Sequence, residues 1–233
     1  MLKTRFYCNI FTEVKRMKKE RKVLVGVLLV LLLLSVCIPQ KVYAANYVGE
    51  ISIVSDGSTK EAIWGVHSFL IYKNLTDKDQ YVANTTVKPG SSITIGTYGN
   101  QNSGKGVYIN LEAYYASKYG AYSSRVSLSK KITKKGLDKF KKAIDDNNKW
   151  TDTKNCAWFA TTVWNKVVSE KYEVSAGKIA TPATLSKNIK KKKNYKSKIA
   201  LPKVNTTYRY KNKKATKCSA SSKKNSWNSS WTD

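Results

Sequence analysis

The first half of the chain follows the two-residue period of apolar and polar positions that is typical of β-strands. Short alternating or apolar segments occupy residues 47–54, 62–74, 93–97, 104–115 and 124–132. They are rich in β-branched and aromatic residues, and Gly-containing turn sequences separate several of them. We expect a strand in each segment, with the fourth continuing into a short helix or turn.

The period changes to that of a helix near residue 130. Leu137, Phe140 and Ile144 recur at helical spacing, and Thr133 precedes them at the position of an N-cap. The lysines between these apolar positions form the solvated face of the predicted helix.

A second predicted helix begins at a cysteine. Seven apolar positions of residues 156–168, including Cys156 itself, fall on one helical stripe. Thr153 or Asn155 can cap the helix, which places Cys156 in its first turn and on its buried face. The pair Thr181-Pro182 opens a short final helix.

The N-terminal segment has the pattern of a secretory signal peptide. A basic stretch at 15–22 precedes the apolar run Val23–Ile38, and small residues follow. The run is short for a membrane span, which needs about 20 apolar residues. We expect residues 1–44 to be removed by cleavage after Ala44 or Ala45; an uncleaved anchor is the alternative.

The remaining chain divides by composition into a domain at 45–202 and a tail at 203–233. The tail is rich in Lys and Ser and poor in branched apolar residues, so we expect it to be flexible. It is either a loosely ordered extension or a segment whose aromatic rings stack on sugars or lie at a membrane interface. The rings in question are Tyr208, Tyr210, Trp227 and Trp231.

The charge of the chain points to an anionic partner. Loss of residues 1–44, which hold nine basic and two acidic residues, lowers the net charge from +28 to +21. Such a charge attracts anions over a long range. Teichoic acids or other cell-wall polymers, phospholipid headgroups and nucleic acid all qualify, and export argues against nucleic acid as the main partner. We expect a secreted or wall-associated monomer.

Candidate chemistry centres on one cysteine and the single histidine of the chain. A helix N-terminus and a nearby imidazolium both lower the pKa of a thiol, so Cys156 and His67 can together form a nucleophile and its base. The unpaired backbone N–H of Cys156 can also stabilise an oxyanion. The alternatives are a cysteine that only packs in the core and a disulfide with Cys218.

Two motifs resemble a known family. "GVHSFLIYKN" at His67 and "NCAWFATTVWN" at Cys156, in this order, are similar to the circularly permuted branch of the NlpC-type papain-like superfamily, which includes the lecithin retinol acyltransferase-like proteins. The resemblance covers roughly residues 47–190. It implies an α+β papain-like fold, with strands first and helices after, in which an antiparallel sheet packs against the cysteine helix. It also implies cleavage or transfer at amides or esters, with Cys156 as nucleophile and His67 as general base.

The polar residue that orients the histidine in this family has several candidates here. Strand order favours Thr97 and Asn100, and the next strand and turn offer Asn110 and Glu112. Glu112 would hold the imidazole most strongly because it is charged.

We therefore expect an exported cysteine hydrolase that cleaves amide bonds, with peptidoglycan peptides as the substrate class. The alternatives are a non-catalytic wall- or membrane-surface binding protein on the same scaffold, and a lipid-directed acyltransferase or esterase. One histidine and two separated cysteines give no metal-ligand spacing, so we expect neither a metal nor a cofactor.

Overall fold

The computed structural model describes residue 21, residues 46–58 and residues 66–220. The expected signal peptide with its cleavage site, and the tail residues Trp227 and Trp231, lie outside the described residues. Within the described ranges, no helix combines the length and the apolar character needed to cross a membrane.

The described part of the chain from residue 46 onward is a mixed α+β structure built on one large sheet, in which every neighbouring pair of strands is antiparallel. Across the sheet the strands are β10 (Lys214–Cys218), β9 (Thr207–Lys211), β6 (Gly106–Ile109), β5 (Ser92–Tyr98), β2 (His67–Asn74), β1 (Tyr47–Asp56), β7 (Val126–Thr133) and β8 (Lys196–Ser197). A separate hairpin consists of β3 (Gln80–Val82) and β4 (Thr85–Val87).

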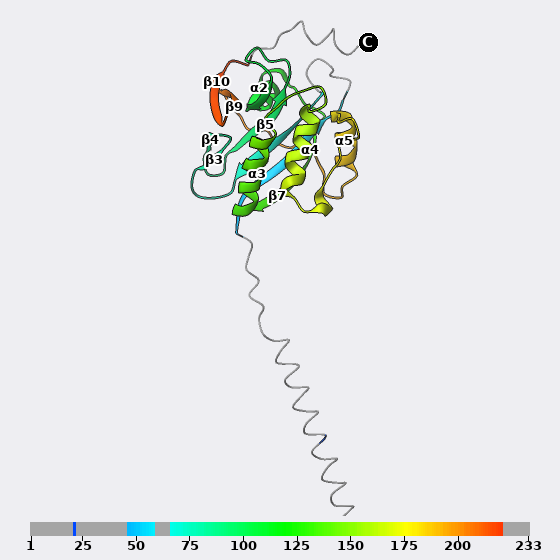
Figure 1. Cartoon of the computed structure of the whole chain (residues 1–233). Coiled ribbons are helices and arrows are strands. Elements are labelled where there is room, and N and C mark those ends of the chain that lie inside the picture. Colours follow the sequence, from blue (N-terminus) through cyan, green and yellow to red (C-terminus); the bar gives the residue numbers. More distant parts are fainter. Residues whose placement is uncertain (1–20, 22–45, 59–65, 221–233) are drawn as a thin grey trace, which may run out of the picture. The chain divides into compact units, whose positions relative to one another are not determined.

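Helices pack on both faces of this sheet. Three of them, α3 (Lys134–Asp146), α4 (Cys156–Val167) and α5 (Pro182–Lys190), lie side by side over one face, with α4 in the middle against β1, β2 and β5 (Figure 1). The helix α2 (Leu111–Tyr119) packs against β5 and β9. A short 3₁₀ turn, Glu170–Tyr172, follows α4.

Each of the three neighbouring helices begins at a side-chain cap that the sequence contains. Thr133 accepts a hydrogen bond from Gly136 N–H at 3.4 Å, as its predicted role as N-cap requires. Of the two candidate caps before α4, Asn155 is the one used, and Thr181 caps α5 directly before Pro182. These contacts satisfy N–H groups that have no partner inside a helix.

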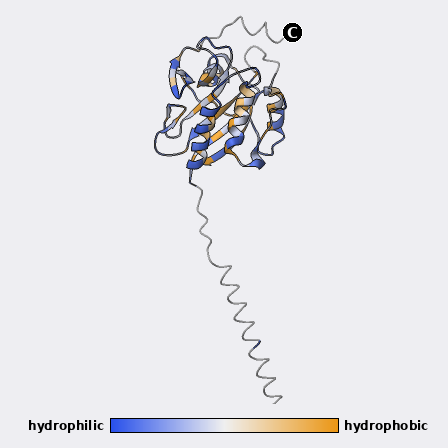
Figure 2. Cartoon of the chain, viewed as in Figure 1, coloured by the Kyte–Doolittle hydropathy of each residue, from blue (hydrophilic) through white to orange (hydrophobic). Residues whose placement is uncertain are grey.

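The alternation of the strands divides the apolar side chains between two cores. On β2, Leu70 and Tyr72 belong to the larger core, which includes Phe159 of α4, whereas Phe69 and Ile71 belong to the smaller core with residues of α2. Figure 2 shows hydrophilic residues over much of the visible side of α3, as its lysines predict. The sheet is therefore buried by helices on both faces, and its ends are where polar groups can gather.

The prediction of a flexible tail from residue 203 is wrong for residues 207–218. Here β9 and β10 form a hairpin that extends the sheet beyond β6. Tyr210 is buried at 4% exposure and donates a hydrogen bond to Asp145, so it is not available for stacking on a sugar. The many lysines hide a two-residue alternation, because on an outer strand only one face needs to be apolar.

The hairpin β3–β4 was also not predicted from the sequence. Its two central residues, Ala83 and Asn84, have positive φ angles of 47° and 53°, as a tight two-residue hairpin turn requires. Alanine is an unusual residue at such a position, and the sequence around it lacks the Asn-Gly or Asp-Gly signal of this turn.

Candidate active site

The fold brings the single histidine next to the cysteine that begins α4. His67 is the first residue of β2 and is 6% exposed, and Cys156 is the half-buried first residue of α4. Because α4 packs on β2, the start of the helix meets the start of the strand. The imidazole and the thiol interact, since each is a cause of the pKa shift of the other. Two side chains 89 positions apart in the sequence thus form one site.

The two groups shift each other toward the charged forms. Burial lowers the pKa of His67, but the Cys156 sulfur and then the Glu112 carboxylate raise it to about 9. Burial raises the pKa of Cys156, but the charge and hydrogen bond of His67, with backbone N–H groups of Ser68 and Ala157, bring it below its ordinary value. The arrangement favours a thiolate–imidazolium pair, the reactive form of a cysteine nucleophile.

Glu112 occupies the position of the third group. Its Oε1 lies 3.2 Å from Nε2 of His67, which leaves Nδ1 of the ring for the sulfur. The carboxylate is fully buried, and the hydroxyl of Thr94 donates to its Oε2 at 2.7 Å. Each carboxylate oxygen therefore has one partner, and the imidazole is held in a single orientation. Of the candidates from the sequence, Glu112 is the one that contacts His67.

Space for this contact depends on a glycine in β5. A Cβ at Gly96 would lie 2.0 Å from Oε1 of Glu112 and 3.0 Å from Nε2 of His67. The backbone at Gly96 pairs with Phe69 on one side and Tyr108 on the other, so β5 cannot move away. Any larger residue here would occupy the space of the His67–Glu112 hydrogen bond.

Aromatic rings close the other sides of the imidazole. Tyr98 lies 4.3 Å and Tyr122 5.7 Å from the ring centroid of His67, and their hydroxyls are 3.2 Å apart. Burial, followed by the charge of Glu112, raises the pKa of both phenols well above 10, so they remain neutral. Tyr122 has a positive φ of 61°, an outlier for a bulky residue. These rings shield the ion pair from water and so strengthen its electrostatic interactions.

The other candidates for the orienting residue have different positions. Thr97 is buried, and its hydroxyl has no hydrogen-bond partner among the described residues; alternation along β5 directs it to the face opposite Gly96. Asn110 is the left-handed N-cap of α2 and accepts a hydrogen bond from Thr94 N–H at 3.3 Å. Asn100 contacts Gln101. The expectation that Thr97 or Asn110 orients His67 is therefore wrong.

Several residues of the site were not identified from the sequence, namely Thr94, Gly96, Tyr98 and Tyr122. Three of them lie in β5, the strand next to β2, and a two-residue alternation from Thr94 places them on one face. The alternation could have grouped these three residues from the sequence alone. Only the pairing of β5 with β2 shows that their face of the sheet meets His67.

The start of α4 leaves one backbone donor beside the sulfur. Oδ1 of Asn155 accepts from the N–H groups of Ala157 and Trp158, both at 3.1 Å, and Nδ2 donates to the carbonyl of Ala180 at 2.7 Å. The cap therefore does not use the N–H of Cys156, which has no acceptor within its own helix. This N–H can donate to an oxyanion that forms next to the sulfur.

Both cysteines in the described ranges, Cys156 and Cys218, are free, and Cys218 ends β10. Over the same ranges, the structure has no group of three His, Cys, Asp or Glu side chains that could hold a metal ion. Comparison of the chain with protein-family models, curated proteins and solved structures finds no match.

Proposed function

We propose that the protein is an exported cysteine hydrolase that cleaves amide bonds, with cell-wall peptides as its substrates. The observation that carries the proposal is the Cys156–His67–Glu112 arrangement at the positive end of α4. A thiol with a lowered pKa, a base within reach and a carboxylate behind that base are the three parts of an activated nucleophile.

In the proposed reaction the Cys156 thiolate attacks the carbonyl carbon of the amide, and the C–S bond forms as the carbonyl oxygen becomes an oxyanion. The N–H of Cys156 stabilises this oxyanion. Collapse of the intermediate breaks the C–N bond, and the His67 imidazolium gives its proton to the departing amine. The neutral imidazole then takes a proton from water, which attacks the thioester. The carboxylic acid leaves, and the thiolate–imidazolium pair is restored.

The same arrangement supports membership in the permuted papain-like branch. The histidine strand precedes the cysteine helix in the chain, α4 packs against the antiparallel sheet, and the orienting carboxylate comes from the segment after the neighbouring strands. A histidine strand before a cysteine helix is the order that the resemblance implies, and it reverses the order in papain. The position of Glu112 on α2 departs from the family, in which the orienting residue often lies on the neighbouring strand.

The charge of the chain supports a location at an anionic wall. Basic residues outnumber acidic ones by 43 to 15, and the expected loss of the N-terminal segment leaves the charge strongly positive. Such a surface raises the local concentration of an anionic polymer and its attached peptides.

The experiment that tests the proposal compares wild-type protein with Cys156→Ala and His67→Ala on purified wall peptides. Both variants should keep the circular-dichroism spectrum and lose turnover, because each removes one reacting group. Unchanged turnover in either variant contradicts the mechanism. Salt-sensitive wall binding with no turnover in the wild type would favour the binding protein, and release of fatty acid from lipid esters without peptide cleavage would favour the lipid-directed enzyme.

A further inference from the structure

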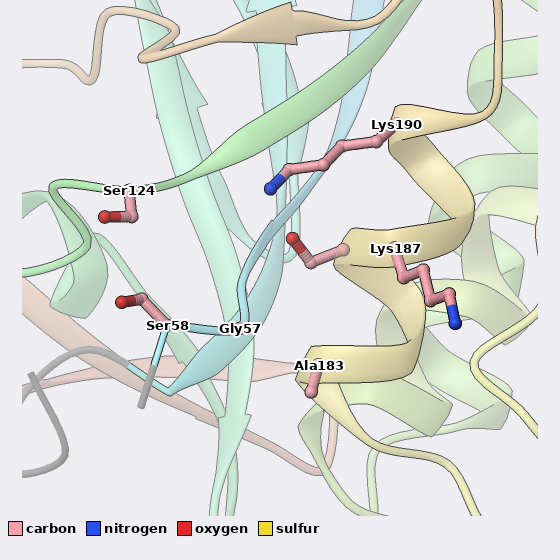
Figure 3. A pocket seen from close by; sticks show the side chains of 7 residues that line it. Gly57, Ser58, Ser124, Ala183, Lys187 and Lys190 are labelled. Carbon is pink, nitrogen blue, oxygen red and sulfur yellow. The ribbon is translucent and has the colours of Figure 1, made fainter. Parts of the chain in front are cut away.

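A cavity lies between α5, the end of β1 and the connection that leads into β7. It has a volume of about 420 Å³, within the range of about 300–1,000 Å³ that small-molecule sites occupy. Its lining consists of Gly57, Ser58, Ser124, Ala183, Ser186, Lys187 and Lys190 (Figure 3). None of the functional residues described above belongs to this lining.

The lining is suited to a negatively charged group. It includes three serines and two lysines, and it contains no acidic side chain. Neither Lys187 nor Lys190 forms an ion pair with any described residue. In Figure 3 the Lys190 side chain extends from α5 toward the strand end that carries Gly57, whereas the Lys187 side chain points away. Lys190 is therefore the cation placed to reach a ligand in the cavity.

A mostly buried serine adds to the polar lining. Ser186 lies on α5, is only 6% exposed and lines the cavity. The carbonyl of Pro182, one turn earlier in the same helix, accepts a hydrogen bond from Ser55 at 2.8 Å.

The cavity lies next to the end of β1 that pairs with the start of β2. Asp56, the residue before Gly57, is the cross-strand partner of His67, and adjacent strands lie about 4.8 Å apart. The Ser55 hydroxyl that contacts Pro182 is also 2.9 Å from that of Ser68, the residue after His67. The cavity therefore lies at the end of the sheet where β2 begins with His67.

One acidic group near the cavity is held by hydrogen bonds from the backbone. The carboxylate of Asp56 accepts hydrogen bonds from the N–H groups of Ser58 at 3.0 Å and Ser124 at 2.9 Å. It is fully buried, and its charge opposes the lowering of the Arg125 pKa that burial causes. The lysines of α5 therefore remain available to an incoming anion.

We infer that this cavity is a binding site for an anionic oxygen group of the substrate, either a carboxylate near the scissile amide or a phosphate of a wall polymer. That the anion belongs to the substrate rests on the proposed function, whereas the binding of an anion in this cavity does not. The ammonium of Lys190 pairs with the anion, and the hydroxyl of Ser186 donates to it.

The test measures binding to full-length Cys156→Ala protein, in which turnover is abolished and bound peptide persists. The probes are a short peptide with a side-chain carboxylate next to the scissile amide, the same peptide with a carboxamide there, and inorganic phosphate. We expect the carboxylate peptide to bind at least about tenfold more tightly than the carboxamide, as for one charge-assisted hydrogen bond. NMR shifts of the amides of Gly57 and Ser186 locate the bound group.

Further substitutions in this background separate a local contact from general attraction to a basic protein. Lys190→Ala should remove most of the preference for the carboxylate peptide over the carboxamide peptide, and Lys187→Ala should remove less of it. Lys139 is an exposed lysine on α3 away from the cavity, so Lys139→Ala should leave this preference intact. Phosphate that binds more tightly than the carboxylate at the same amides identifies a polymer phosphate as the source of the anion.

Equal affinities for the carboxylate and the carboxamide peptide, together with no effect of phosphate on these amides, would overturn the inference. So would a loss of preference that is the same in all three lysine variants. These results are distinct from failure of the proposed function. Equal cleavage of both peptides by the wild-type protein would support the hydrolase and contradict the anion site. Anion binding without any cleavage would support the anion site and contradict the hydrolase.

Discussion

Removal of the Cys156 sulfur should lower the pKa of His67. In the wild-type protein burial opposes protonation of the ring, and the sulfur and Glu112 together overcome it, which raises the pKa from 6.5 to about 9. The sulfur is the larger of the two favourable influences. In Cys156→Ala the ring keeps its burial and its carboxylate but loses the stronger partner.

The size of the effect follows from the same balance. A rise from 6.5 to about 9 corresponds to about 3 kcal/mol of preference for the protonated ring. Because the sulfur accounts for more of the favourable interaction than Glu112, its removal should lower the pKa by more than about one unit, a tenfold change in the protonation equilibrium. Glu112→Gln, which keeps the shape of the side chain and removes its charge, should lower it by less.

The assay is simple because the chain contains one histidine. Its ring signals in NMR spectra, recorded from pH 5 to 10, give the pKa of His67 without assignment of other imidazoles. The pKa of His67 should be highest in the wild type, lower in Glu112→Gln and lowest in Cys156→Ala. A wild-type value near 6.5, or the same value in wild type and Cys156→Ala, would refute the ion pair.

Three further substitutions test the surroundings of the pair, and a fourth, Gly90→Ala, is the control for the first. Gly96→Ala should reduce kcat about 100-fold, because its Cβ displaces Glu112. Gly90→Ala should lower stability and leave kcat unchanged, because Gly90 has a φ of +71° and a Cβ there would have no atom within 4 Å. Equal kcat values in the two variants would contradict the steric argument. Thr94→Val should lower kcat and destabilise the fold by about 1–3 kcal/mol, because Glu112 Oε2 loses its donor. An unchanged free energy of unfolding in denaturant, together with an unchanged kcat, would contradict this. Asn155→Ala should lower the free energy of unfolding by about 1 kcal/mol through loss of the α4 cap, and an unchanged denaturation midpoint would argue against that cap.

Local signals in the sequence predicted much of what positions the site. The caps of α3 and α5 and the apolar stripe of α4 depend on neighbouring residues, and the structure confirms them. For the same reason the sequence could place Cys156 in a first helical turn. The strands before residue 130 also follow from their alternation, with β2 confirmed from His67 onward.

The parts that were missed, or left open among several candidates, depend on pairing between distant segments. The contact between His67 and Glu112 requires β5 and β6 to bring α2 back beside β2, and no spacing in the sequence encodes this. The hairpin β9–β10 was mistaken for a tail because exposed strands at the end of a sheet carry many lysines, a composition that disordered segments share.

The most direct test of the Cys156–His67 pair is the pH dependence of alkylation of Cys156 by iodoacetamide, followed by mass spectrometry with Cys218 in the same chain as the internal reference. We expect Cys156 to react rapidly below pH 7, where Cys218 reacts slowly. His67→Ala should remove this advantage of Cys156 and leave the reaction of Cys218 unaffected. Parallel pH profiles for the two cysteines in wild-type protein, or rapid reaction of Cys156 that persists in His67→Ala, would contradict this expectation.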